Sequence, residues 1–420
     1  MAGQARRRLT IVIKLGTSSI VDEKTHEPLF SILSVIVKTC VKLIKDGHRV
    51  VLVSSGAIGV GLRRMDLDRR PKHLPKVQAL AAIGQCRLMS LWDKLFDNLN
   101  QPVAQILLTR NDIADRTQYQ NAQATFTELF KMNVIPIVNE NDTLAVTEIK
   151  FGDNDTLSAI TAGMVQADYL FLMTDVDCLY DKNPRSNPEA RAIEVVEDIA
   201  DLEADVSSAG SALGTGGMST KIVAARFATS AGVTTVITRS SKPGNIPAIV
   251  SYIESRRAAP PSPRQNTAVA PLHTRFLPNP HPIRDRQFWL LYSLAPHGTI
   301  FIDYGAWKKM SGTSTRNLLP AGVVGVEGNF GQQEAARLVV VQRLPPTDSD
   351  PAPFEVGRAL VNYSAAEIRK IRGLKSTDIH EALGYADSSY VALRGNIAFY
   401  EDKRSRPATP ALLDGGVGLD

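Results

Sequence analysis

Short apolar runs and longer amphipathic stretches alternate along residues 9–238 of the chain. Apolar runs bounded by turn residues are typical of buried parallel strands, and apolar residues spaced three or four apart are typical of helices. The predicted strands are residues 9–15, 48–53, 103–108, 134–138, 168–173 and 233–238, and the predicted helices are residues 28–46, 76–98, 117–132, 155–165 and 218–231. This alternation predicts an α/β fold, a three-layer αβα sandwich with a mostly parallel sheet.

The pattern changes after residue 255. Seven prolines fall between residues 256 and 286, a composition that disfavours helices and central strands and predicts a linker over residues 256–290. Beyond it we expect short strands at residues 289–292, 299–303, 323–326, 337–341, 354–362 and 390–393, and a helix at 365–372. The expected organisation is a catalytic domain (1–255), this linker, a small β-barrel-like domain (291–398) and a C-terminal tail (399–420). The proline-rich segment 341–354 resembles an added loop.

Composition narrows the class of protein. Of 420 residues, 44% are hydrophobic and 22% charged, and no apolar run is long enough to span a bilayer. The net charge of +5 is too diffuse to indicate nucleic-acid binding by itself. We expect no secretion signal, because Lys14 interrupts the apolar run after the N-terminal arginines. Three widely spaced cysteines, Cys40, Cys86 and Cys178, favour a reducing compartment and predict a cytoplasmic protein.

A glycine-rich segment that leads into a predicted helix has the character of an anion site. Glycines let the backbone approach a ligand closely, and free N–H groups at a helix start favour phosphate oxygens. The same glycines are also compatible with a plain turn. Ile222 follows the lysine where a Walker loop requires serine or threonine, and no dinucleotide fingerprint has the correct spacing. The segment is Gly214-Thr215-Gly216-Gly217-Met218-Ser219-Thr220-Lys221.

Polar segments also follow the ends of the predicted strands. Each is compatible with an ordinary turn. Together they predict one ligand-binding rim, because ligands of open α/β sheets lie beyond the carboxyl ends of the strands. These segments are residues 14–19, 54–57, 139–142 and 174–175, joined by residues 151–155 before a predicted helix.

This ordered set of motifs resembles the glutamate 5-kinase family of the amino acid kinase superfamily. The resemblance covers residues 9–253, and residues 297–394 resemble a PUA domain. It implies ATP-dependent phosphorylation of the γ-carboxylate of L-glutamate, giving L-glutamyl 5-phosphate and ADP, the first step of proline biosynthesis. The chemistry agrees, because a carboxylate is ionised at neutral pH and needs no general base, and the rim contains no histidine.

The resemblance also implies roles for individual residues. Lys14 and Lys221 would flank the transferred phosphoryl group, and Asp155 would hold both lysines. Asp142 would contact the α-ammonium group of glutamate and Asn154 its carboxylate side, with Ser55 and Gly56 completing the substrate site. Mg²⁺ would be held by the ATP phosphates, and no protein metal site is expected. The implied ATP-binding residues are Lys14, Gly16, Thr174, Asp175, Thr215, Gly216, Gly217, Met218, Ser219, Thr220 and Lys221.

Other interpretations stay open. Lys14 can instead extend to solvent, and Asp155 or Asp175 can act as a helix cap. Another acceptor, such as acetylglutamate, aspartate or a nucleoside monophosphate, would suit the same fold. RNA binding by the C-terminal domain is disfavoured, because few aromatic residues lie among its cations. We expect a homo-oligomer, and a glutamyl-phosphate reductase is a candidate partner. The cations are Lys308, Lys309, Arg369, Lys370, Arg372 and Lys375.

Overall fold

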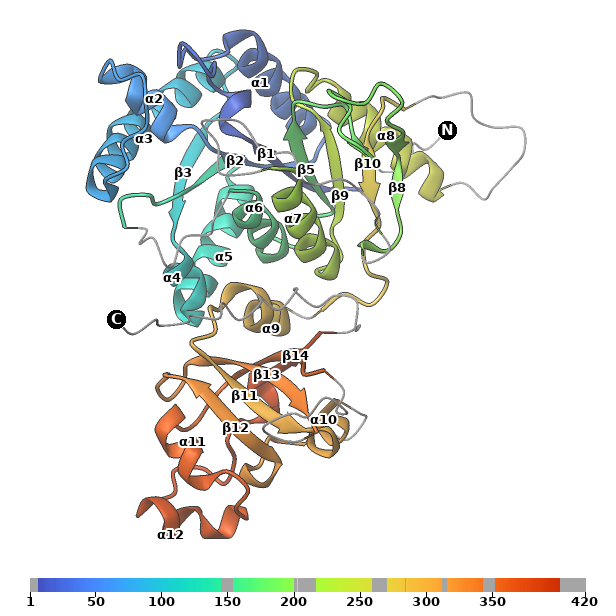
Figure 1. Ribbon diagram of the computed structural model, residues 1–420. Helices are drawn as coiled ribbons and strands as arrows, with labels where there is room; N and C mark the ends of the chain where they lie inside the picture. The colour runs from blue at the N-terminus through green and yellow to red at the C-terminus, as the bar shows by residue number, and fades with distance from the viewer. Residues whose placement is uncertain are drawn as a thin grey trace. The chain divides into compact units, whose positions relative to one another are not determined.

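A computed structural model describes residues 7–144, 154–199, 202, 217–258, 270–283, 285–311, 316–342 and 352–400 (Figure 1). The chain divides into two compact units, Met1–Asp285 and Arg286–Asp420. Among the described residues, every helix is too short or too polar to cross a lipid bilayer.

The first unit is built around an eight-stranded sheet in the order β3-β4-β2-β1-β5-β9-β10-β8. All neighbouring strands run parallel except β9 and β10, so the prediction of a mostly parallel sheet is confirmed. β1 lies inside the sheet between β2 and β5. The strands are β1 (Thr10–Leu15), β2 (Arg49–Ser54), β3 (Val103–Leu108), β4 (Ile135–Glu140), β5 (Tyr169–Thr174), β8 (Val195–Val196), β9 (Thr234–Arg239) and β10 (Thr274–Phe276). A separate pair is formed by β6 (Leu179–Tyr180) and β7 (Ala192–Ile193).

Helices cover both faces of this sheet (Figure 1). On one face α1 (Phe30–Lys45), α3 (Leu74–Asp97) and α8 (Asn245–Ala258) bury their apolar sides against the strands in one continuous core. On the other face α6 (Asn154–Met164) packs on β1, β2, β4 and β5, beside α5 (Arg116–Lys131) and α7 (Met218–Ser230). Three of these helices were not predicted, namely α8 and the short helices α2 (Ala57–Arg64) and α4 (Arg110–Ala114).

Two glycines let α2 and α3 touch backbone to backbone. A Cβ atom at Gly84 would lie 1.7 Å from the carbonyl oxygen of Ala57, and one at Gly61 would lie 2.1 Å from that of Leu80. Real Cβ atoms do not approach so closely, so any side chain at either position would push the helices apart. This contact holds the middle of α3 beside the turn that follows β2.

The second unit contains a five-stranded sheet in the order β12-β11-β13-β14-β15, in which only β11 and β13 pair in parallel. This confirms the prediction of a small β-rich domain. In α10, the rings of Tyr304 and Trp307 pack edge to face. The elements are α9 (Asp285–Phe288), η3 (Trp289–Ser293), β11 (Gly298–Asp303), α10 (Tyr304–Ser311), β12 (Val323–Gly328), β13 (Ala335–Val341), β14 (Phe354–Leu360), α11 (Ala365–Ile371), α12 (Ile379–Leu383) and β15 (Ile397–Phe399).

Three predictions of local structure were wrong. Residues 289–292 form the π-helical turn η3 rather than a strand, and all four are buried; an apolar run of that length does not distinguish a strand from a buried helix. At 390–393 only Ala392 makes a strand-like bridge, to Leu318, and the strand lies at β15. The expected linker contains β10, which is a strand paired on both sides, with β9 and with β8. This pairing is possible because Thr274–Phe276 contains no proline. Residues 343–351 of the expected loop and 401–420 of the tail lie outside the described residues.

Candidate active site

Strand alternation places Lys14 on the side of the sheet that α6 covers. In β1, Ile11, Ile13 and Leu15 enter the core beneath α1, so the side chain of Lys14 points to the opposite face. Only 4% of Lys14 is exposed, which makes the solvent-directed interpretation of this lysine wrong. Asp155, in the first turn of α6, meets it there.

Lys14, Asp155 and Lys221 form a buried charge cluster. The Nζ atom of Lys14 lies 2.5 Å from Oδ1 of Asp155, and Nζ of Lys221 lies 3.2 Å from Oδ2. Asp155 is fully buried and Lys221 is 7% exposed. Two buried ammonium groups share this one carboxylate. Closely spaced cations of this kind favour an anionic ligand beside them.

The start of α7 is tied to the same carboxylate. The Thr220 hydroxyl lies 2.8 Å from Oδ2 of Asp155, to which it can donate, and it accepts a bond of 3.0 Å from the N–H of Gly217. Lys221 follows as the next residue of α7, which packs against α6. Asp155 therefore holds together β1, α6 and the end of the glycine-rich segment.

The charge state of Asp155 follows from this environment. Burial raises the pKa of its carboxyl group, but the ammonium groups of Lys14 and Lys221, with the Thr220 hydroxyl, outweigh burial and lower the pKa from 3.8 to about 2. Asp155 is thus ionised at neutral pH.

We predict a pH dependence of stability from this group. Because the folded-state pKa lies below the ordinary value, the contribution of Asp155 is complete above about pH 4 and is lost as the pH falls toward 2. A shift of this size corresponds to roughly 2 kcal/mol. In urea unfolding, the free-energy difference between wild type and Asp155→Asn should therefore shrink as the pH falls below about 4. A difference that stayed constant over that range would contradict the assignment.

A chain of amides lies beside the charge cluster. Asn154, the first residue of α6, donates through Nδ2 to the Ser55 hydroxyl at 2.8 Å and to Oδ1 of Asn139 at 3.3 Å. Asn139, the fifth residue of β4, donates through Nδ2 to Oε1 of Gln85 on α3 at 2.7 Å. The network joins α6, β4, α3 and the turn after β2.

Glycines bring two backbone turns close to these side chains. Gly56, between β2 and α2, has φ +105, a left-handed conformation that favours glycine, and a Cβ atom there would lie 3.3 Å from Ile20. A Cβ atom at Gly16 would lie 3.8 Å from the Lys14 Nζ atom, so the turn after β1 runs past the ammonium group.

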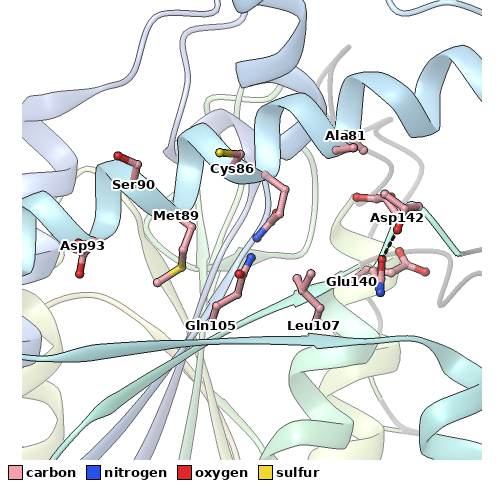
Figure 2. Close-up of a pocket in the computed structure, with 13 residues that line it drawn as sticks. Ala81, Cys86, Met89, Ser90, Asp93, Gln105, Leu107, Glu140 and Asp142 are labelled. Carbon is pink, nitrogen blue, oxygen red and sulfur yellow. Dashed lines mark hydrogen bonds between the residues drawn. The ribbon is translucent and has the colours of Figure 1, made fainter.

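Asp142 lines a pocket of about 660 Å³ between α3 and the strands β3 and β4 (Figure 2). Figure 2 shows Gln105 and Leu107 of β3 pointing toward α3, from which Met89 points back toward the strand, with Glu140 and Asp142 at one end. Carboxylates and amides dominate its polar lining, which favours a ligand that carries hydrogen-bond donors or positive charge. Gln85 belongs to this lining and also to the amide chain, so the pocket and the chain share one side chain.

On the other side of β1, Thr174 is the last residue of β5 and Asp175 follows it. Thr174 is buried and its hydroxyl lies 3.1 Å from Oδ1 of Asp175, while the second carboxylate oxygen pairs with Arg185. Asp175 therefore acts in an ion pair, and the interpretation as a helix cap is wrong. Asp177 pairs with Arg239, the last residue of β9.

The structure brings the predicted catalytic residues Lys14, Asp155 and Lys221 into direct contact, and it joins Ser55 to Asn154. Met218 and Ser219 lie in the first turn of α7, with Ser219 exposed. Thr215 and Gly216 lie outside the described residues. Sequence reasoning missed Gln85, although it shares one stripe of α3 with Ala81 and Met89 at a spacing of four residues, which marks it as a polar position on the face turned to the sheet.

Comparison with known proteins identifies both parts of the chain. The model of the amino acid kinase family matches residues 9–239, and the model of the PUA domain matches residues 298–383. A probable glutamate 5-kinase of Schizosaccharomyces pombe is 54% identical over 386 residues, covering 92% of each chain. An uncharacterized protein of Saccharomyces cerevisiae is 47% identical over 414 residues, covering 93% of this chain and 98% of its own. A glutamate 5-kinase of Cyanothece is 46% identical over 389 residues, covering 92% and 98%.

Proposed function

Because the chain belongs to the amino acid kinase family, we propose that it transfers the terminal phosphoryl group of ATP to the γ-carboxylate of L-glutamate. The products are L-glutamyl 5-phosphate and ADP, and this reaction is the first step of proline biosynthesis. The observation that supports this proposal is the buried Lys14–Asp155–Lys221 cluster, in which two ammonium groups are held close together where a phosphoryl group in transit can be bound.

The transfer requires little covalent chemistry from the protein. An oxygen of the ionised γ-carboxylate attacks the γ-phosphorus, a new O–P bond forms, and the bond to the β-phosphate oxygen breaks so that ADP leaves with its electron pair. Negative charge spreads over the transferred oxygens between these events. The ammonium groups of Lys14 and Lys221 supply positive charge at that position, in a site where burial strengthens their effect.

Asp155 acts through the two lysines. Its ionised carboxylate fixes one ammonium group on each oxygen, so both amine tips are in position before substrates bind. Positioning in advance lowers the cost of organising the charges during the reaction. The role proposed for Asp155 is thus structural support of the catalytic groups.

Mg²⁺ fits this site as an ion held mainly by the ATP phosphates and water. Among the described residues no three His, Cys, Asp or Glu side chains gather as a metal cage, and Mg²⁺ commonly keeps several waters beside substrate phosphates. When bound, it would neutralise charge on the phosphates. The described residues proposed for the ATP side are Lys14, Gly16, Thr174, Asp175 and residues 217–221.

We also propose a partner enzyme, an oligomeric state and a cellular compartment for this chain. An acyl phosphate hydrolyses readily, so a reductase that consumes it directly is the expected partner, and we expect the chain to act as a homo-oligomer. The cytoplasm, which is reducing and contains ATP, is the proposed compartment. The free thiols Cys40, Cys86 and Cys178 agree with that placement.

An acceptor panel tests the proposed reaction. ADP release should depend on L-glutamate, and acetylglutamate, aspartate and uridine monophosphate should each give kcat/KM lower by about 10²-fold or more, because the acidic lining of the pocket favours a correctly placed ammonium group. The γ-glutamyl phosphate itself is trapped as the hydroxamate. Turnover with acetylglutamate but not glutamate would overturn the acceptor assignment.

A further inference from the structure

The orientation of every amide in the chain beside the site follows from one backbone group. The N–H of Glu140 can only donate, and it lies 2.9 Å from Oδ1 of Asn139. The atom of Asn139 at that position must therefore be the oxygen. Its Nδ2 then faces Gln85 at 2.7 Å, so the facing atom of Gln85 must be the acceptor Oε1.

The position of the Asn139 oxygen also fixes the orientation of the Asn154 amide. Its atom nearest to Oδ1 of Asn139 must be a donor, which fixes Nδ2 between Asn139 and the Ser55 hydroxyl. Two consequences follow. The Ser55 oxygen accepts from Asn154, so its single proton is left to donate. The Oδ1 atom of Asn154 is buried, and no donor lies within hydrogen-bond distance of it in the part of the chain that the structure describes.

A buried acceptor without a donor is costly, and a ligand that brings a donor removes that cost. Of the groups on glutamate, only the α-ammonium group donates at neutral pH, and the two carboxylates only accept. Asn154 Oδ1 thus matches the ammonium group, and the free Ser55 proton matches a carboxylate oxygen. Asp142 and Glu140 line the pocket that shares Gln85 with the amide chain, and their carboxyl groups favour a cationic group there.

We propose that Gln85 is a positioning residue for substrate specificity, which acts through Asn139 to hold the Asn154 acceptor toward the α-ammonium group of glutamate. The inference rests on the proposed function. It assigns Asn154 to the ammonium group rather than to the carboxylate side. Gln85 touches neither the charge cluster nor the phosphoryl group in this account, so it governs recognition of the amino acid and not the chemical step.

Steady-state kinetics of the full chain test this role. Gln85→Met keeps the length of the side chain but removes the acceptor, and should raise KM for L-glutamate about tenfold with kcat and KM for ATP within about twofold. Gln85→Glu keeps an acceptor oxygen and should restore KM to near the wild-type value. Gln120→Met, at an exposed glutamine of α5 that lies outside the pocket, is the matched control and should leave all constants unchanged. Thermal unfolding of each variant checks the fold.

Two substrate analogues separate the ammonium group from the α-carboxylate. Both are tested as competitive inhibitors. 4-Aminobutyrate keeps the ammonium group of glutamate but lacks its α-carboxylate, and glutarate keeps both carboxylates but lacks the ammonium group. Gln85→Met should weaken 4-aminobutyrate about as much as glutamate and leave glutarate unchanged. Equal weakening of both analogues, or an unchanged KM for glutamate, would overturn the inference; if neither analogue binds, the KM ratio of Gln85→Met to Gln85→Glu decides. Wild-type turnover is measured first, since its absence refutes the proposed function and not this role alone.

Discussion

Lys221→Met is expected to lower kcat for glutamate phosphorylation by about 10³-fold while KM for glutamate stays within a few fold. The lysine side chain is buried in the charge cluster, with its ammonium group 3.2 Å from Asp155. Methionine replaces its apolar stem and removes only the charge. Because that charge acts mainly when the phosphoryl group moves, the loss should appear in kcat, measured by coupled ADP release.

The fold should tolerate this change. Without Lys221, the ion pair between Lys14 and Asp155 remains and is electrically neutral, so no buried charge is left without a partner. The melting temperature should therefore stay close to that of the wild type. Lys131→Met, at an exposed lysine of α5 paired with Glu128, is the control and should retain full activity. A Lys221→Met variant with wild-type kcat would remove this residue from the mechanism.

Asp155→Asn is expected to destabilise the protein by about 3–5 kcal/mol and to reduce kcat strongly as well. The substitution keeps the size of the side chain but removes the carboxylate charge that pairs with two buried ammonium groups. In the wild type these groups share the carboxylate that lies between them. Chemical unfolding measures the free-energy loss directly.

The phosphates of a bound nucleotide should compensate part of this loss. We expect ATP to raise the melting temperature of Asp155→Asn more than that of the wild type, because the phosphates take over as counter-ions of the two lysines. Asp115→Asn, at the exposed cap of α5, is a matched control that should change stability by less than about 1 kcal/mol, because asparagine is also a good N-cap, and it should show the wild-type response to ATP. An equal ATP response in Asp155→Asn and wild type would place the nucleotide away from the cluster.

The elements that carry the cluster could be predicted from the chain. β1 is an apolar run ended by polar residues, α7 begins where the glycine-rich segment ends, and strand order in a parallel sheet gathers such ends at one edge. The predicted bounds of these elements differ from the observed ones by only a residue or so.

Contacts between elements that lie far apart in the sequence could not be predicted in this way. Gln85 lies 54 positions before Asn139, and their contact depends on the glycine crossing that holds α3 beside α2. Periodicity shows that Gln85 faces the sheet but not which strand it meets. β10 was missed for a related reason, since three residues between prolines carry too weak a local signal and gain their structure from pairing with β9 and β8.

The most direct test is a crystal structure of the protein with glutamate, ADP, Mg²⁺ and aluminium fluoride, a mimic of the phosphoryl group in transfer. We predict that the Nζ atoms of Lys14 and Lys221 both lie about 3 Å from fluoride ligands of the aluminium. If either amine stayed on Asp155 alone, beyond hydrogen-bond distance of the mimic, the proposed role of the two lysines would be contradicted.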